Sequence, residues 1–166
     1  MYYQSGSSAK TIGLNNVLAS GFKLNANWEM KIDLKIEGPD KWANILQVKK
    51  IGLSQGQYGY RLPTIYVTPE GRLEVSASFS GTWNWFSKKV RFDGPVVRRN
   101  GWFTLNLLHN NGKFQIYIDN VLKDEYVNTI PQDWDNVELI FGFDKDGVPA
   151  AVAEFKNFVY RGFGKL

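Results

Sequence analysis

The chain has 166 residues, enough for one domain with a sizeable core and too few for two, so a single domain over residues 1–166 is predicted. The absence of cysteine excludes disulfides, thiolate metal sites and a thiol nucleophile. No apolar run approaches the roughly 20 residues of a membrane span, and a net charge of +4 is too small to indicate nucleic acid as a partner. Six Trp, eight Tyr, eleven Phe and sixteen Gly favour strands and tight turns.

The first third of the chain contains one strict strand pattern. Residues 11–18 and 21–24 are predicted as two short strands. Along 28–37, apolar and charged residues alternate without exception, which indicates a strand with one face in the core and one in water. The next strand is predicted at 42–50, and a glycine-rich and glutamine-rich loop follows at 52–59.

Further short strands are predicted in the middle of the chain, at 65–67, 72–79 and 86–92. A turn at 69–71 and a loop at 80–85 separate them, and Gly94-Pro95 is expected to end the last one.

The segment 102–120 predicts a β-hairpin, because two runs with a period of two flank Asn110-Asn111-Gly112, whose residues tolerate positive φ. Asp119-Asn120 turns the chain again into a strand at 121–127. A connection at 131–136 with a single helical turn, and strands at 137–143 and 153–163, complete the chain. Roughly eleven to thirteen short strands without an amphipathic helix predict an all-β fold, an antiparallel two-sheet β-sandwich of the jelly-roll type.

Several segments carry a family resemblance, which covers roughly residues 22–160 and is strongest at 101–122. Gly101-Trp102 leads a strand, and Gly-Lys-Phe-Gln-Ile-Tyr-Ile-Asp-Asn-Val-Leu follows at 112–122; Gly-Arg-Leu-Glu-Val at 71–75 and Phe-Lys-Asn-Phe-Val-Tyr at 155–160 add to it. This order resembles the laminin-G-like members of the concanavalin A-like lectin/glucanase superfamily. The resemblance implies a curved jelly roll and carbohydrate or protein binding. A secreted, extracellular mature domain is expected, while a cytoplasmic location stays open.

Two branches of that superfamily are not supported. The galectin sugar-binding patterns are absent, and the single histidine, His109, lies in a predicted hairpin tip. Glucanases carry paired carboxylates on one strand face, as Glu29, Asp33 and Glu37 do here. Because lysines alternate with these residues, the carboxylates are expected to stay ionised, and a solvated face with cross-strand charge pairs is predicted instead of catalysis.

The most suggestive candidate for a binding site is the aromatic and basic region after residue 82. Trp83 and Trp85 are two residues apart, so both rings point the same way if the segment is extended. Lys88 and Arg91 follow them. Aromatic rings stack on the apolar faces of sugars, and basic groups donate hydrogen bonds to hydroxyls, carboxylates or sulfates. The pattern favours an acidic glycan; the alternative is a tryptophan lid on the core beside solvated basic residues.

A second candidate surface is the polar face of a sheet. Gln115 and Tyr117 are expected to line it with Thr104 and Asn106, together with residues expected in the same sheet, namely Tyr66, Ser76 and Ser78. Trp28, Trp42 and Trp134 are assigned to packing in the core or at its rim.

No cofactor is predicted, apart from a weak calcium candidate at Asp144 and Asp146, which are also ordinary turn formers. The leading hypothesis is a carbohydrate-binding or adhesion module without catalysis, whose partner is a glycan. The alternatives are a protein-interaction module that forms a homo-oligomer or binds another protein, and a polysaccharide-cleaving glycoside hydrolase.

Overall fold

The computed structural model describes residues 3–38, 41–78, 89–97, 100–144 and 147–164. These residues form thirteen strands and no α-helix. In chain order the strands are β1 Tyr3–Gln4, β2 Lys10–Thr11, β3 Asn16–Leu24, β4 Asn27–Gly38, β5 Ala43–Lys50, β6 Thr64–Val67, β7 Arg72–Ser78, β8 Lys89–Val96, β9 Trp102–Asn110, β10 Lys113–Ile118, β11 Val121–Val127, β12 Trp134–Phe141 and β13 Val152–Phe163.

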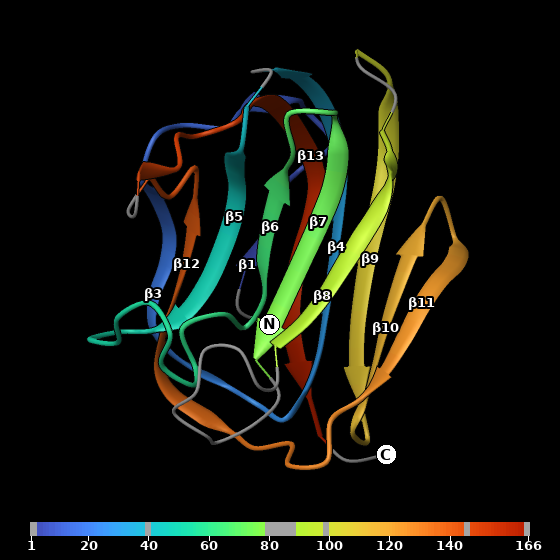
Figure 1. The fold of residues 1–166 in the computed structure, drawn as a ribbon. Coiled ribbons are helices and arrows are strands. Elements are labelled where there is room, and N and C mark those ends of the chain that lie inside the picture. The colour runs from blue at the N-terminus through green and yellow to red at the C-terminus, as the bar shows by residue number, and fades with distance from the viewer. Residues whose placement is uncertain (1–2, 39–40, 79–88, 98–99, 145–146, 165–166) are drawn as a thin grey trace.

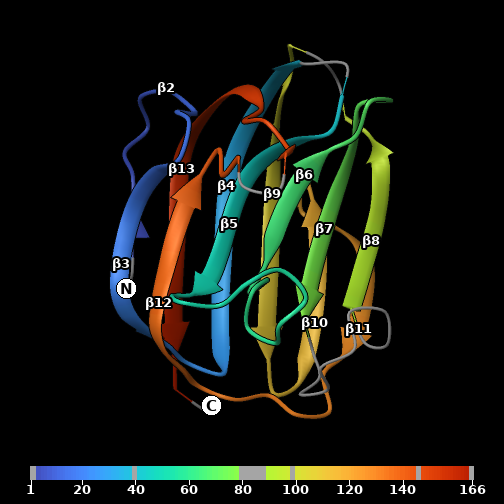
Figure 2. The same cartoon turned by 60° about the vertical axis from the view of Figure 1, so that its left-hand side comes forward.

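The strands form two antiparallel sheets packed face to face. The seven-stranded sheet has the order β1-β13-β4-β9-β10-β11, with β2 also paired to β13, and the six-stranded sheet has the order β3-β12-β5-β6-β7-β8. Figures 1 and 2 show the six-stranded sheet in front and the seven-stranded sheet behind it. The predicted two-sheet jelly-roll sandwich is therefore confirmed.

The core lies between the sheets and follows the alternation of the sequence. On β4, Met30, Ile32 and Leu34 are fully buried. Leu34 lies opposite Phe155 of β13 on one side and Phe103 of β9 on the other, so apolar side chains meet across three strands. Burial of each such side chain stabilises the fold by roughly 1.5–3 kcal/mol.

Two predicted turns are present as the sequence indicates. Asn111 and Gly112 have φ values of 49° and 76° between β9 and β10. Asp119 and Asn120 have φ values of 50° and 64° between β10 and β11. Two successive positive φ values match the right-handed twist of the flanking strands and fix the hairpin register.

Three predicted boundaries are wrong. The two strands expected at 11–18 and 21–24 are instead the short β2 and the single strand β3, because Gly21 (φ 74°) lies within β3 at a register shift against β12, as in a β-bulge. Gly94-Pro95 lies within β8, an edge strand, where proline is tolerated because one side of the strand has no ladder partner. The helical turn expected within 131–136 is absent from these described residues, and β12 begins there at Trp134, which pairs with Leu24.

Candidate functional site

The outer face of the six-stranded sheet carries two rows of polar and aromatic residues. In the first row, Asn44 of β5 lies opposite Tyr66 of β6, which lies opposite Glu74 of β7. The neighbouring row contains Gln47, Thr64 and Ser76 on the same three strands. Alternate residues of these strands, Leu46, Ile65, Val67, Leu73 and Val75, belong to the core, so the two rows face outward.

Most of these polar side chains form a buried floor. Asn44, Thr64 and Ser76 are fully buried, and Glu74 is buried as well. The Ser76 hydroxyl donates to Oε1 of Glu74 over 3.2 Å, and Oδ1 of Asn44 accepts from the backbone N–H of Phe143 over 3.0 Å. These bonds hold the floor in one arrangement before any ligand arrives.

Two polar atoms of the floor have spare hydrogen-bonding capacity. Nδ2 of Asn44 and Oγ1 of Thr64 are buried, and neither has a hydrogen-bond partner among the residues that the structure describes. Buried polar groups are normally satisfied by protein or by ordered water. Because Asn44 and Thr64 are fully buried, only a small enclosed molecule such as water could satisfy these two atoms.

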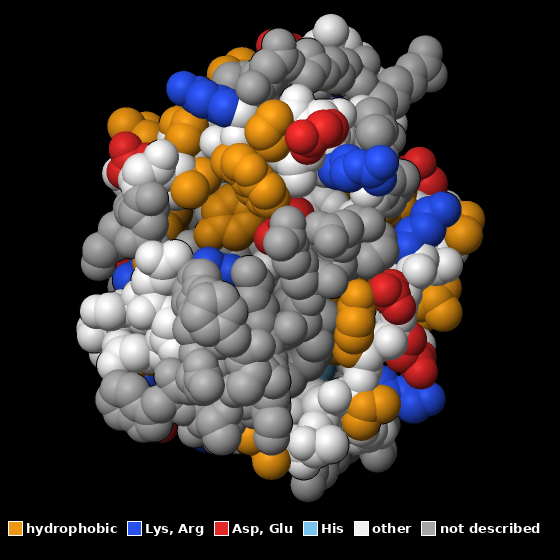
Figure 3. Space-filling view, viewed as in Figure 1, with side chains coloured by type: hydrophobic (Ala, Val, Ile, Leu, Met, Phe, Trp, Pro, Cys, Tyr) orange, Lys and Arg blue, Asp and Glu red, His pale blue; other side chains and the backbone are white. Residues whose placement is uncertain are grey.

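Aromatic rings and a guanidinium group stand over this floor. Trp42 is 39% exposed, and its ring lies 6.4 Å from that of Tyr66 at an interplanar angle of 78°. The guanidinium carbon of Arg61 lies 5.9 Å from the centre of the Tyr66 ring, and Arg61 is itself buried, with 7% of its surface exposed. Figure 3 shows hydrophobic side chains gathered on this side of the molecule over the upper part of β5 and β6. A ligand with an apolar face and a polar edge would match this combination.

The aromatic and basic candidate site falls mostly outside the described residues. Trp83, Trp85 and Lys88 all lie there, so their predicted role stays a prediction. Arg91 belongs to β8, and its backbone lies opposite Ser76, at the end of the row that contains Thr64. The structure thus places one predicted basic residue on the strand next to the polar floor.

The second candidate surface does not exist as predicted. Gln115 and Tyr117 lie on β10 of the seven-stranded sheet, whereas Tyr66 and Ser76 lie in the six-stranded sheet, as does the backbone of Ser78. The expectation of one common sheet is wrong, because a period of two assigns a residue to a face but does not say which strands pair. Gln115 donates from Nε2 to Glu125 over 2.7 Å on its own sheet.

The carboxylates of β4 are held by partners from neighbouring strands. Arg161 of β13 contacts Oε2 of Glu29 through Nε at 3.1 Å and Nη2 at 2.8 Å. Asp33 accepts from the Thr104 hydroxyl over 2.6 Å and from Nδ2 of Asn157 over 2.7 Å. Cross-strand pairing was predicted for this face, although the cation beside Glu29 is an arginine of β13 and not an interleaved lysine.

The third carboxylate of that face, Glu37, shares a cation with another acid. Nζ of Lys35 lies 3.4 Å from Oε1 of Glu37 and also forms an ion pair with Glu154 of β13. The hydrogen bond with Glu154 raises the pKa of Lys35. Lys35 thus links Glu37 to the neighbouring strand β13, in agreement with the charge pairing predicted for this face.

At the predicted calcium turn, Asp144 is paired with an amide. Its Oδ1 accepts from Nδ2 of Asn15 over 2.9 Å, and its backbone N–H donates to Oδ1 of Asn15 over 3.0 Å. Asp146 lies outside the described residues, and the described part of the chain holds no cluster of three or more metal-ligating side chains. Calcium binding here stays a prediction.

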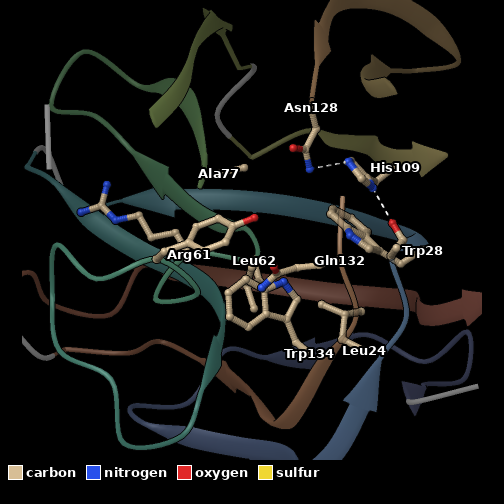
Figure 4. A pocket seen from close by; sticks show the side chains of 11 residues that line it. Leu24, Trp28, Arg61, Leu62, Ala77, His109, Asn128, Gln132 and Trp134 are labelled. Atoms are coloured by element: carbon tan, nitrogen blue, oxygen red, sulfur yellow. Dashed lines mark hydrogen bonds between the residues drawn. The ribbon is translucent and has the colours of Figure 1, made fainter. Parts of the chain in front are cut away.

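His109 lies at a narrow pocket between the two sheets, near the end of β9 (Figure 4). Its Nδ1 lies 2.6 Å from the Ala26 carbonyl oxygen and must donate, so Nε2 accepts from Nδ2 of Asn128 over 3.1 Å. Burial lowers the pKa of His109, which favours the neutral ring. The pocket, about 20 Å³ in volume, has room for water but not for a sugar.

The three tryptophans assigned to packing take different positions. Trp28 is buried in the core, as predicted, and it also stacks on His109 at 5.9 Å. Trp134 lies half-buried against the core. Trp42 stands at the rim beside Tyr66, where it becomes part of the candidate site. No pattern in the sequence indicated Arg61, whose position beside Tyr66 depends on the path of the loop before β6.

Comparison with known proteins supports the fold. No protein-family model matches the chain, and no curated protein matches it. Similar solved structures include the carbohydrate-binding module CBM66 from Bacillus subtilis, with a TM-score of 0.56 and 14% identity over 98% of this chain and 99% of that one. CBM40 of the Ruminococcus gnavus IT-sialidase, bound to α2,3-sialyllactose, has a TM-score of 0.58 and 14% identity over 96% of this chain and 95% of that one.

A third similar structure is the botulinum neurotoxin serotype D binding domain, with a TM-score of 0.56 and 16% identity over 94% of this chain. The chain spans 43% of that domain, less than half of its length. At these identities the likeness establishes the β-sandwich fold and no closer kinship. The laminin-G-like resemblance therefore stays a prediction.

Proposed function

We propose that the protein is a non-catalytic carbohydrate-binding module whose glycan site is the outer face of the six-stranded sheet around Tyr66. The observation that carries the proposal is the combination of the exposed Trp42, the half-buried Tyr66 and the Arg61 guanidinium over a prearranged polar floor. Sugars present an apolar ring face to aromatic groups, so Trp42 and Tyr66 would stack on the sugar ring, while the buried floor lies beneath them.

The similar solved structures support this class of function. CBM66 and CBM40 are carbohydrate-binding modules, and each is covered almost completely by this chain. Both matches concern binding modules and not catalytic domains. A secreted or extracellular location would suit a glycan-binding module, and this location stays a prediction.

The finer proposal is that the preferred glycan is acidic. Arg61 stands beside Tyr66, and Arg91 lies on the strand next to Ser76. CBM40 is bound to α2,3-sialyllactose, an acidic glycan, in its structure. Guanidinium groups pair with carboxylates and sulfates in bidentate geometry. A site with such groups would therefore prefer acidic glycans to neutral sugars.

A glycan array with neutral, sialylated and sulfated glycans tests the proposal. We expect Tyr66→Ala and Trp42→Ala each to weaken binding roughly tenfold, because each removes one stacking ring. Tyr117→Ala is the matched control, because Tyr117 is a half-buried tyrosine on the other sheet.

Binding to no glycan would contradict the proposal, and a loss caused by Tyr117→Ala alone would move the site to the seven-stranded sheet. For an acidic glycan, we also expect affinity to fall as salt rises.

The exposed edge strand β11 is the feature that bears on the protein-interaction alternative. Val121, Leu122 and Val127 of the edge strand β11 are 55%, 47% and 69% exposed. The register of β11 against β10 shifts between Ile116 and Tyr117, which leaves Lys123 as an extra residue on β11. Such an irregular, charged edge disfavours continuous pairing with another strand. Sedimentation that shows a mass independent of concentration would exclude self-association.

A further inference from the structure

A second hollow lies at one end of the sandwich, away from the Tyr66 face. Its volume is about 320 Å³, and it is formed by the turn between β3 and β4, the start of β12 and the end of β13. The residues that line it are Lys23, Asn25, Ala26, Asn27, Asp133, Phe163 and Gly164. None of them is a residue of the site around Tyr66.

An ion pair forms one wall of this hollow. Nζ of Lys23 lies 3.4 Å from Oδ2 of Asp133, and the two side chains are 58% and 52% exposed. Oδ1 of Asp133 accepts from the backbone N–H of Ala26 over 2.8 Å, which fixes the carboxylate. A carboxylate accepts hydrogen bonds and an ammonium group donates them, so this wall presents acceptors and donors side by side.

An anchored amide and an aromatic ring form the opposite wall. Asn27 is buried, and its Oδ1 accepts from the backbone N–H of Asn111 over 2.9 Å. Phe163 of β13 lies directly opposite Asn27 in the register of the two strands, and its side chain is half-buried. A fixed amide therefore stands beside a ring that the solvent reaches.

We propose that this hollow is a second saccharide site, which takes one neutral sugar residue. The charges of Lys23 and Asp133 offset each other, so the lining does not select an ionic ligand. Neighbouring hydroxyls of a sugar would donate to Asp133 and accept from Lys23, while the apolar ring face contacts Phe163. A volume of about 320 Å³ lies at the lower end of the roughly 300–1,000 Å³ of small-ligand pockets, which fits a single residue.

A protein with two separate saccharide sites can bind a branched or repeating glycan at both. The second contact is then intramolecular and raises the overall affinity without any new interaction. This inference does not depend on the site at Tyr66, because the two sites share no residue.

Nuclear magnetic resonance titration with glucose, galactose and mannose tests the second site. We expect these sugars to shift the backbone amide signals of Ala26, Asn27 and Gly164 in the wild type and equally in Tyr66→Ala. Lys23→Gln and Phe163→Ala should each weaken this binding about tenfold. Lys23 is exposed, so Lys23→Gln keeps the test valid even if Phe163→Ala fails to fold.

Two results would overturn the proposal. One is that none of the three sugars shifts these amide signals at millimolar concentration. The other is that the shifts persist in Lys23→Gln but disappear in Tyr66→Ala, because the perturbation would then originate at the first site. If the glycan array shows no binding but the sugars still shift these amide signals, only the proposed site at Tyr66 is rejected.

Discussion

The single histidine shows how one side chain ties packing to protonation. His109 is buried between Trp28 and Phe114, and both ring nitrogens are used, one toward the Ala26 carbonyl and one toward Asn128. Protonation of Nε2 would turn the acceptor of the Asn128 amide N–H into a donor, and this hydrogen bond would be lost. The fold is therefore built for the neutral imidazole.

This arrangement predicts a loss of stability in mild acid. Burial lowers the pKa of His109 below its ordinary value of 6.5 in the folded state, so the unfolded chain binds a proton first as the pH falls. The contribution of His109 to the free energy of unfolding is complete above pH 6.5. It is lost as the pH falls toward the folded-state pKa of His109, by up to about 1.4 kcal/mol per pH unit. Urea unfolding at pH 7.5 and at pH 5 measures this loss.

The matched variant is His109→Gln, which keeps a polar side chain but cannot titrate. Its free energy of unfolding should depend less on pH over the same interval than that of the wild type. An identical pH dependence in the two proteins would show that other groups cause the loss.

The strands of the six-stranded sheet are joined by a shielded ion pair. Nζ of Lys49 on β5 lies 3.0 Å from Oε1 of Glu138 on β12, and the side chains are only 8% and 17% exposed. The rings of Tyr60 and Phe143 flank the ammonium group at 5.7 and 5.3 Å. This pair therefore links two strands to the loop before β6.

Removal of the lysine alone should be costly. Lys49→Met would leave Glu138 without this cation in a place largely shielded from water, and we expect a loss of about 3 kcal/mol in the free energy of unfolding. In the double variant Lys49→Met with Glu138→Gln, most of the loss should be recovered, because no charge then remains. If the losses of the two single variants simply add, the pair is not coupled.

The two ends of the chain meet in one sheet, and this determines how the fold can form. The last strand, β13, lies between β1 and β4 and also pairs with β2, so all of its partners come from the beginning of the chain. It supplies buried side chains to the core, including Phe155, Phe158 and Tyr160. The seven-stranded sheet is incomplete until this strand is present.

A chain that ends at Gly147 should therefore not fold. It loses all of β13, and with it core burial worth several kcal/mol, against a typical total stability of about 5–15 kcal/mol. We expect a poorly dispersed amide proton spectrum for this truncation. A chain that ends at Gly164 keeps every strand and should give a dispersed spectrum; a folded Gly147 truncation would contradict the argument.

The fold class could be predicted from the sequence because its cause is local. In a strand, successive side chains point to opposite faces, so the alternation along 28–37 and the turn residues at 110–112 specify strands and hairpins without reference to distant residues. The composition, rich in aromatic residues and glycine, favoured strands and tight turns. The same reasoning correctly predicted a charged outer face for β4.

Only the tertiary structure decided where the candidate sites lie. Tyr66 and Tyr117 belong to similar strand patterns, yet they are on different sheets, because strand pairing is set by contacts between residues far apart in the chain. Arg161 beside Glu29 and Phe163 opposite Asn27 are likewise pairs of residues far apart in the chain. The period of two determined the faces of the strands by itself, whereas the partner of each face depends on packing that no local pattern encodes.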